Sequence, residues 1–335
     1  MEDFAEFNLV GHSPAFLQVL ELTRRFAGCD ATVLLQGETG TGKELVARAI
    51  HYVGARRDFP FIPVNCGALP DSLVESELFG HARGAFTDAR DARRGLISEA
   101  QGGTLFLDEI EVLTAKAQVA LLRFLQDLEY RPVGGAVVRD ADVRIIAASN
   151  ANLGELVRDG TFRRDLLFRL DVLSINLPRL RERQRDVVLL AEMFLKRLAR
   201  QYRMPPKSIH PDAVQGLLGH EWPGNVRELE NLIHREFLMT DGPMLYLNCL
   251  APAGQRLKDA GDAALSRLTE SRFQEAKACA IAHFERTYIV ELLSRTHGNI
   301  SQAARISGKE RSRLGKLVKK YGLERTAFAR SAEAG

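Results

Sequence analysis

The chain has 335 residues, of which 45% are apolar, so we expect two or three domains with ample hydrophobic cores. Its apolar runs are too short to span a bilayer, its start is not basic like a signal peptide, and its four cysteines form no CxxC pair, so we expect a cytoplasmic protein without a zinc or disulfide framework. Residues 1–255 carry 30 Lys and Arg against 34 Asp and Glu, whereas residues 256–335 carry 16 against 9, which predicts a polyanion partner for the C-terminal end unless the charges line a solvated helix.

A glycine-rich loop, Gly37-Glu-Thr-Gly-Thr-Gly-Lys43, follows an apolar run at 32–36 and precedes a helical pattern at 44–50. Glycines let backbone N–H groups converge on phosphate oxygens, and the helix N-terminus and Lys43 add positive charge. A glycine turn that only caps a helix is the alternative, but the flanking strand and helix favour an NTP site. The general pattern has Ser or Thr after the lysine to hold Mg²⁺, where this chain has Glu44. The residues expected to bind nucleotide are Gly37, Glu38, Thr39, Gly40, Thr41, Gly42, Lys43 and Glu44.

The next candidate site is a buried-strand run at 102–109, Gly-Gly-Thr-Leu-Phe-Leu-Asp-Glu, which ends in two adjacent carboxylates. Because side chains alternate along a strand, we expect the two to point differently. Asp108 is predicted to hold Mg²⁺, and Glu109 is predicted to polarise the water that attacks the γ-phosphate. Two solvated acids at a strand end are the alternative, but beside the glycine loop the pair indicates an ATPase.

The middle of the chain predicts an α/β domain followed by a helical lid. Further strand runs at 61–65, 143–150 and 172–177 are separated by helical patterns such as 118–128, which indicates a parallel sheet flanked by helices. From about 186 to 240 the pattern is purely helical, with candidates at 186–202, 211–218 and 225–240. We expect an ATPase core at 1–180, a lid at 181–250, a linker at 251–272 and a DNA-binding domain at 273–335.

Three short amphipathic helices are predicted near the C-terminus, with breaks at Gly298-Asn299 and Ser307-Gly308, as in a helix-turn-helix. Base edges are usually read near the start of such a recognition helix, and its later residues meet phosphate. A basic bundle used only for oligomerisation is the alternative. The apolar stripes are Phe284, Tyr288, Leu292 and Leu293, then Ile300, Ala303, Ala304 and Ile306, then Leu314, Leu317, Val318 and Tyr321. The predicted DNA contacts are Lys309, Arg311, Arg313, Lys316, Lys319 and Lys320.

Several ordered motifs together resemble the bacterial enhancer-binding proteins, the NtrC-type AAA+ activators of sigma-54 RNA polymerase. The resemblance covers roughly residues 8–245 and 282–323. It implies a AAA+ P-loop ATPase that binds palindromic upstream DNA, assembles from dimers into a hexameric ring, and uses ATP and Mg²⁺ to remodel sigma-54 polymerase for open-complex formation. The motifs are Gly37–Glu44, Glu75–His81, Gly84–Ala89, Gly102–Glu109, Phe162–Leu170 and Trp222–Leu229.

The resemblance also implies roles for single residues. Asn65 is similar to the family's switch asparagine, which holds the catalytic glutamate, here Glu109; without the resemblance it is merely a polar strand terminus. Asn150 matches the sensor I position, whose amide orients water or the γ-phosphate. Glu44 is the family's usual residue after the lysine.

Three arginines gain roles in the same way, although each alone would be a surface salt-bridge residue. Arg163 and Arg169 resemble the arginine fingers that neutralise charge on a neighbouring subunit's nucleotide. Arg227 resembles sensor II on the lid. A site shared between subunits implies a ring.

The loop Gly84-Ala-Phe-Thr-Asp-Ala89 departs from the family's GAFTGA at Asp88. Because Phe86 and Thr87 remain, we expect them to contact sigma-54. The alternative is a DNA-binding regulator of ordinary polymerase with an ATP-responsive oligomerisation module. A AAA+ remodeller of another kind, such as a replication initiator or unfoldase, is disfavoured by this loop and by the helix-turn-helix.

A second departure is that only residues 1–7 precede the ATPase core, which leaves no room for the receiver or ligand-sensing domain that most such activators carry. We therefore expect control from elsewhere. A separate inhibitory or co-activating protein in trans, promoter-level control of the protein's own abundance, or truncation of a longer protein would each fit.

Overall fold

The computed structural model of the chain divides into two units, Met1–Leu250 and Ala251–Gly335. No helix in the part of the chain that the structure describes is both long and apolar enough to cross a membrane. The structure describes residues 4, 6–70, 73–85, 89, 91–183, 185–247, 285, 288–289, 292–293, 296, 299–308 and 310–320.

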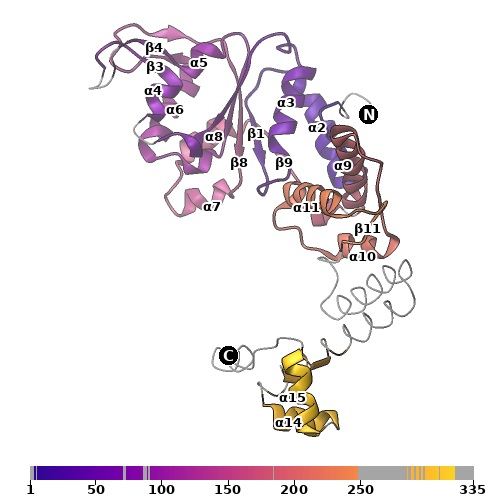
Figure 1. Ribbon diagram of the computed structural model, residues 1–335. Helices are drawn as coiled ribbons and strands as arrows, with labels where there is room; N and C mark the ends of the chain where they lie inside the picture. Colours follow the sequence, from indigo (N-terminus) through magenta and orange to yellow (C-terminus); the bar gives the residue numbers. More distant parts are fainter. Residues whose placement is uncertain are drawn as a thin grey trace. The chain divides into compact units, whose positions relative to one another are not determined.

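The first unit is built on a five-stranded parallel sheet (Figure 1), which confirms the predicted α/β fold. Each of its strands lies in one of the predicted apolar runs. Because all strands are parallel, their carboxyl ends meet at one edge, where Asn65 pairs with Asp108 and Gln36 with Ser149. In order across the sheet, the strands are β2 (Phe61–Asn65), β5 (Thr104–Asp108), β8 (Arg144–Ser149), β1 (Val33–Gln36) and β9 (Leu173–Asn176).

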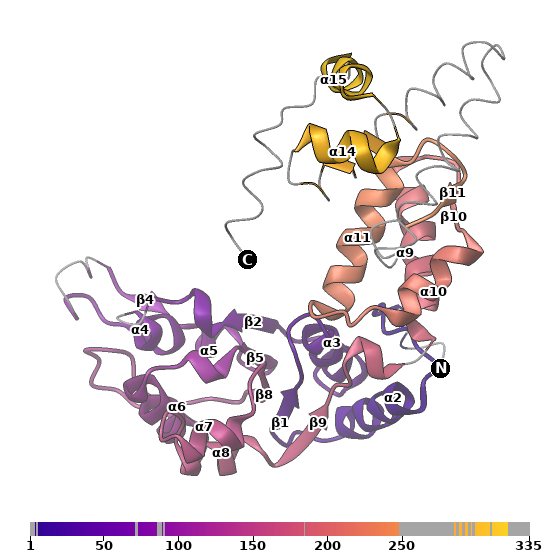
Figure 2. The ribbon, with the colours of Figure 1, turned by 90° about the horizontal axis from the view of Figure 1, so that it is seen from below.

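Helices cover both faces of this sheet (Figures 1 and 2), and successive strand residues alternate between two cores. On β5, Leu105 and Leu107 face one core and Phe106 faces the other. The second core holds α2 (Pro14–Ala27) and α3 (Lys43–Val53). The first core holds α4 (Val74–Phe79), α5 (Leu96–Glu99), α6 (Ala115–Asp127), α7 (Leu153–Arg158) and α8 (Arg164–Leu170).

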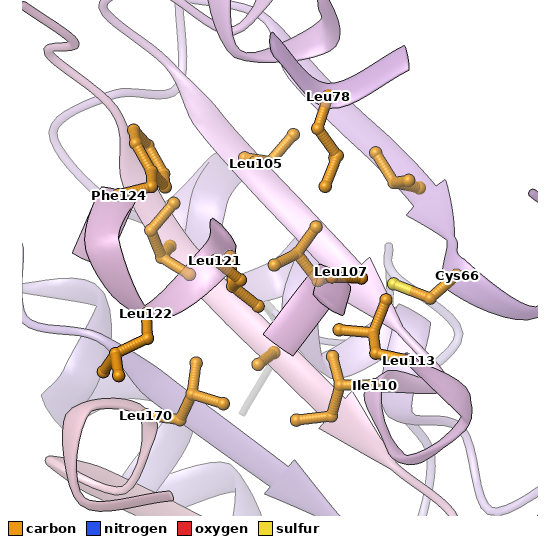
Figure 3. Close-up of a cluster of buried hydrophobic side chains, with 14 of the residues drawn as sticks. Cys66, Leu78, Leu105, Leu107, Ile110, Leu113, Leu121, Leu122, Phe124 and Leu170 are labelled. Carbon is orange, nitrogen blue, oxygen red and sulfur yellow. The ribbon is translucent and has the colours of Figure 1, made fainter. Parts of the chain in front are cut away.

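Figure 3 shows the first core, in which Leu121 and Phe124 of α6 lie beside Leu105 and Leu107 of β5. Helix α6 begins three residues before the predicted 118–128 because Thr114 caps it and accepts the Ala117 N–H at 3.3 Å. Short elements join the main ones. They are the 3₁₀ turns η1 (Cys66–Ala68), η2 (Ile110–Val112) and η3 (Leu180–Arg183), and the antiparallel pairs β3 (Gly80–His81) with β4 (Arg93–Arg94) and β6 (Glu129–Tyr130) with β7 (Arg139–Asp140).

The lid follows the sheet as three helices around their own core, which holds Phe194, Trp222 and Phe237. All three match the predicted bounds to within one residue. The purely helical prediction was incomplete, because β10 (Ser208–Ile209) pairs in parallel with β11 (Met244–Leu245), and two-residue strands leave no periodic signal. The helices are α9 (Asp186–Tyr202), α10 (Pro211–Gly219) and α11 (Asn225–Met239).

In the second unit, α14 (Ile300–Ser307) and α15 (Arg311–Lys320) flank Gly308, whose φ of 63° makes the predicted turn. Leu314 and Val318 pack on Ile300, Ala303 and Ala304. Helix α15 begins after the predicted Lys309.

Two residues of the predicted stripes were wrong. Tyr288 and Ile306 are exposed, whereas Ile289 is buried together with the predicted Leu292 and Leu293. Ile289 precedes these two residues by three and four positions, which is the spacing of one helix face. Phe284, Lys309, Tyr321 and the predicted linker 251–272 lie outside the described residues, as do the side chains of Lys319 and Lys320.

Candidate active site

The glycine loop turns from β1 into α3 as predicted. Gly40 and Gly42 have φ values of 80° and 102°, which residues with a Cβ rarely adopt. Gly42 is the N-cap of α3, so the free N–H groups of the helix start lie at the loop. This geometry can cradle an anion.

Lys43 lies buried over this loop. Its Nζ donates to the carbonyl oxygens of Gly37 at 2.7 Å and Glu38 at 3.2 Å, and to Oδ1 of Asn150. Burial lowers the pKa of Lys43, and Asp108, Glu111 and Glu109 oppose that change. The ammonium is therefore held among three carboxylates at the carboxyl edge of the sheet.

Asp108 ends β5, and Glu109 follows it with a left-handed φ of 57°. Because Glu109 lies outside the strand, its side-chain direction is set by this backbone turn and not by strand alternation. The Glu109 N–H donates to Oδ1 of Asp108 at 3.0 Å. Burial raises the pKa of Asp108, while Lys43 and this N–H oppose the change.

Asn150 joins these groups from the end of β8. Besides accepting from Lys43, its Nδ2 donates to Oε1 of Glu109 at 3.4 Å, and its backbone N–H donates to Oε1 of Glu111 at 3.1 Å. Glu111 was not predicted from the sequence, because an acidic residue just beyond the Asp108-Glu109 pair looks like a solvated side chain. In the structure, the turn η2 brings Glu111 back to the edge of the sheet.

Asn65 lies at the same edge, but its Oδ1 caps η1. It accepts the N–H groups of Gly67 at 2.8 Å and Ala68 at 3.1 Å. In this conformation the hydrogen bond to Glu109 comes from Asn150, so the predicted restraint of Glu109 by Asn65 stays a prediction. The simpler reading of Asn65 as a polar strand terminus describes its contacts here.

The lid touches the loop at Gly40. A Cβ on Gly40 would collide with the carbonyl oxygen of Gly224 and lie 3.1 Å from Cβ of Arg227, and the Val226 N–H donates to the Gly40 carbonyl at 3.0 Å. Arg227 therefore begins beside the phosphate cradle, as the sensor II prediction requires.

Asn225 is a second residue that the sequence did not single out. It is fully buried at the start of α11, where its Nδ2 donates to Oε2 of Glu38 and to the Thr39 carbonyl, both at 3.1 Å. Its Oδ1 accepts the Leu180 N–H at 2.8 Å, and Arg179 pairs with Oε1 of Glu38 at 2.9 Å. The Glu38 carboxylate thus joins the loop to the lid. The sequence signal that could have identified Asn225 is its place in the motif Trp222-Pro-Gly-Asn-Val226.

The two predicted finger arginines belong to α8, with Arg163 as its N-cap and Arg169 in its last turn. Arg163 is exposed and pairs with Asp165 at 2.7 Å, and this hydrogen bond raises the pKa of Arg163. Arg169 is exposed near the end of the same helix. A shallow depression there is lined by Arg163, Arg164, Asp165 and Phe168.

Two other predictions concern Glu44, which was expected to bind nucleotide, and the loop of Phe86 and Thr87, which was expected to contact sigma-54. The Glu44 carboxylate accepts from its neighbour Arg48 at 2.7 Å on an exposed face of α3. Phe86, Thr87 and Asp88 lie outside the described residues, but the base of their loop is closed by a hydrogen bond of 2.7 Å from the Gly84 N–H to the Ala89 carbonyl.

The parallel sheet, the glycine loop, the strand-end Asp-Glu pair and the helical lid together define a P-loop ATPase of the AAA+ class. Residues 9–176 match the sigma-54 interaction domain, residues 181–266 match the AAA+ ATPase lid domain, and residues 280–321 match the bacterial regulatory proteins of the Fis family. The chain belongs to the family of AAA+ sigma-54 interaction-domain regulators, which confirms the predicted resemblance.

Curated relatives match almost the whole chain. The phenol regulator MopR of Acinetobacter guillouiae is 42% identical over 96% of this chain and 57% of its own length. The regulatory protein AtoC of Escherichia coli is 42% identical over 95% of this chain and 68% of its own. The crystal structure of NtrX from Brucella abortus in complex with ATP has a TM-score of 0.70, is 35% identical, and covers 94% of this chain and 69% of that one.

Proposed function

We propose that this chain is a sigma-54-dependent transcriptional activator that binds upstream DNA and uses ATP hydrolysis in a ring to remodel sigma-54 polymerase. One observation carries the proposal. Lys43, Glu109 and Asn150 are joined by hydrogen bonds at one sheet edge, within the segment that matches the sigma-54 interaction domain, and a Fis-type helix-turn-helix follows in the same chain.

Within this site, Lys43 and the N–H groups at the start of α3 bind the phosphates. Glu109 accepts a proton from water, and Asn150, which already contacts its Oε1, orients that water. Arg227 adds positive charge from the lid.

The residues present fit Mg²⁺, with Asp108 as the protein ligand. Among the described residues, no three His, Cys, Asp or Glu side chains form a set that could hold a metal by themselves. Mg²⁺ needs no such set, since it is commonly held by one or two carboxylates together with nucleotide phosphates. When bound, the ion would neutralise charge on the phosphate oxygens.

The match to the sigma-54 interaction domain includes residues 84–89, which favours contact of Phe86 and Thr87 with sigma-54 over the alternative of a regulator of ordinary polymerase. The hydrogen bond from the Gly84 N–H to the Ala89 carbonyl brings the two ends of this segment together.

Open-complex formation on a supercoiled sigma-54 promoter, with purified polymerase, this protein and ATP, tests the function. We expect open complexes that depend on ATP and are lost when Phe86 is replaced by alanine. ATP hydrolysis without open complexes, on a promoter that carries a bound upstream site, would contradict it.

The ring proposal predicts that sites are shared between subunits. Arg163→Ala and Arg169→Ala should each bind ATP normally and hydrolyse it at least tenfold more slowly, because a positive charge near the neighbour's γ-phosphate is lost. Both side chains are exposed, so the stability of the fold should change little.

Mixing either variant with Lys43→Ala should restore part of the activity, since intact half-sites meet across an interface. Arg158→Ala, which alters an exposed arginine of α7, is the matched control and should hydrolyse ATP normally. No rescue at any mixing ratio, with subunit exchange verified, would place the two arginines in their own subunit's site.

The DNA-binding proposal predicts two kinds of loss along α15. Arg311 and Arg313 are exposed at its start, so replacing either by alanine should reduce discrimination between specific and scrambled DNA by about 1–3 kcal/mol. Lys319→Ala near its end should weaken all sequences alike and reduce the salt slope by about one. Binding of each variant to both duplexes over a salt series distinguishes the two. Specific binding that survives deletion of residues 282–335 would overturn the assignment.

A further inference from the structure

Glu111 is the acidic residue at this sheet edge to which the proposed hydrolysis assigns no task. It lies in the turn η2, two residues after Glu109. Its Oε1 accepts the backbone N–H of Asn150 at 3.1 Å. Its Oε2 is buried and has no hydrogen-bond partner in the described part of the chain.

The Asn150 N–H needs such an acceptor because it lies just beyond the sheet. The ladder between β1 and β8 ends where Gln36 pairs with Ser149, and the Gly37 N–H takes the Ser149 carbonyl at 3.3 Å. Because an unpaired backbone N–H away from water is costly, the carboxylate of Glu111 helps to hold the main chain of Asn150 in place.

The amide of Asn150 is then oriented by charge. Its Oδ1 faces the ammonium of Lys43, and its Nδ2 faces the carboxylate of Glu109 at 3.4 Å. With its main chain held by Glu111, the side chain has one arrangement that satisfies both neighbours.

We infer that Glu111 is a positioning residue, which holds Asn150 so that its amide bridges Lys43 and Glu109 during ATP hydrolysis. The inference rests on the proposed roles of Glu109 and Asn150. Glu111 also brings negative charge near Lys43 and Asp108, so the test must separate its hydrogen bond from its charge.

Glutamine keeps the acceptor oxygen and removes the charge, whereas alanine removes both. We expect E111A to lower kcat at least tenfold, because a small displacement of a catalytic group can cost up to about 10²-fold, while the Kd for ATP changes less than threefold. E111Q should regain most of that loss. Glu21→Ala, the same change at an exposed position on α2, is the control, and thermal unfolding of each full-length variant checks folding.

A double-mutant cycle with Asn150→Ala decides whether Glu111 acts through Asn150. If it does, the double variant should hydrolyse ATP no more slowly than Asn150→Ala alone. The inference would be overturned if the kcat losses of the two single variants multiplied in the double variant, or if E111Q and E111A lost equal activity. It would also be overturned if the Kd for ATP rose as much as kcat fell. Absence of hydrolysis by the unaltered chain would instead refute the proposed function.

Discussion

Replacing Glu109 by alanine should leave ATP binding nearly unchanged and reduce turnover by about 10² to 10⁴-fold. The change removes the carboxylate that accepts from Asn150, yet it leaves Lys43 and the N–H groups of the glycine loop in place. The left-handed backbone at Glu109 is the main structural risk, so Glu109→Gln should be measured beside it. Steady-state hydrolysis and ATP titration of the same preparations check the expectation.

Lys43→Ala is the contrasting variant, because it removes the buried ammonium over the loop and should lose ATP affinity first. Near-normal turnover in both Glu109 variants would remove Glu109 from the chemistry. An unchanged ATP Kd in Lys43→Ala would contradict the phosphate-cradle interpretation.

Replacing Asp186 by asparagine should reduce the free energy of unfolding of the first unit by about 3–5 kcal/mol, because it breaks a buried ion pair and leaves Arg183 uncompensated. Asp186 and Arg183 are both 3% exposed and lie 3.2 Å apart. Asp186 also accepts from the N–H of His12 at 2.7 Å and from the hydroxyl of Ser13 at 2.7 Å, so it joins the lid to the start of the core. Urea unfolding measures the change.

The loss should depend on pH. Burial by itself would raise the pKa of Asp186, but the His12 N–H, Ser13 and Arg183 together lower it below 3.8. A lowered pKa means that the charge stabilises the fold above the unfolded value and ceases to do so as pH falls through the folded value. The variant should therefore differ fully from the parent at pH 7 and less below about pH 3.8. Asp58→Asn, at an exposed position, is the control, and an equal effect there would argue against the buried pair.

Much of the site could be predicted because its chemistry is local. The loop Gly37–Lys43 carries its own backbone requirement, and the pair Asp108-Glu109 follows directly from a strand. Glu111 and Asn225 could not be found in this way, since each gains its role from hydrogen bonds to residues 39 and 187 positions away. Asn65 is the opposite case, because its Oδ1 accepts the backbone N–H groups of Gly67 and Ala68, which lie only two and three residues further along the chain.

The sequence by itself determined the strands of the sheet, the lid helices and the helix-turn-helix, because apolar periodicity and glycine positions act over a few residues. It also identified the family, because the motifs and their order along the chain are visible without a structure. Only the tertiary structure decided which polar groups meet. Parallel strands bring Lys43, Glu109, Glu111 and Asn150 to one edge, and the turn at Asn225 brings the lid onto Gly40. Those contacts depend on register and on backbone turns such as the left-handed Glu109, which the residue pattern does not encode locally.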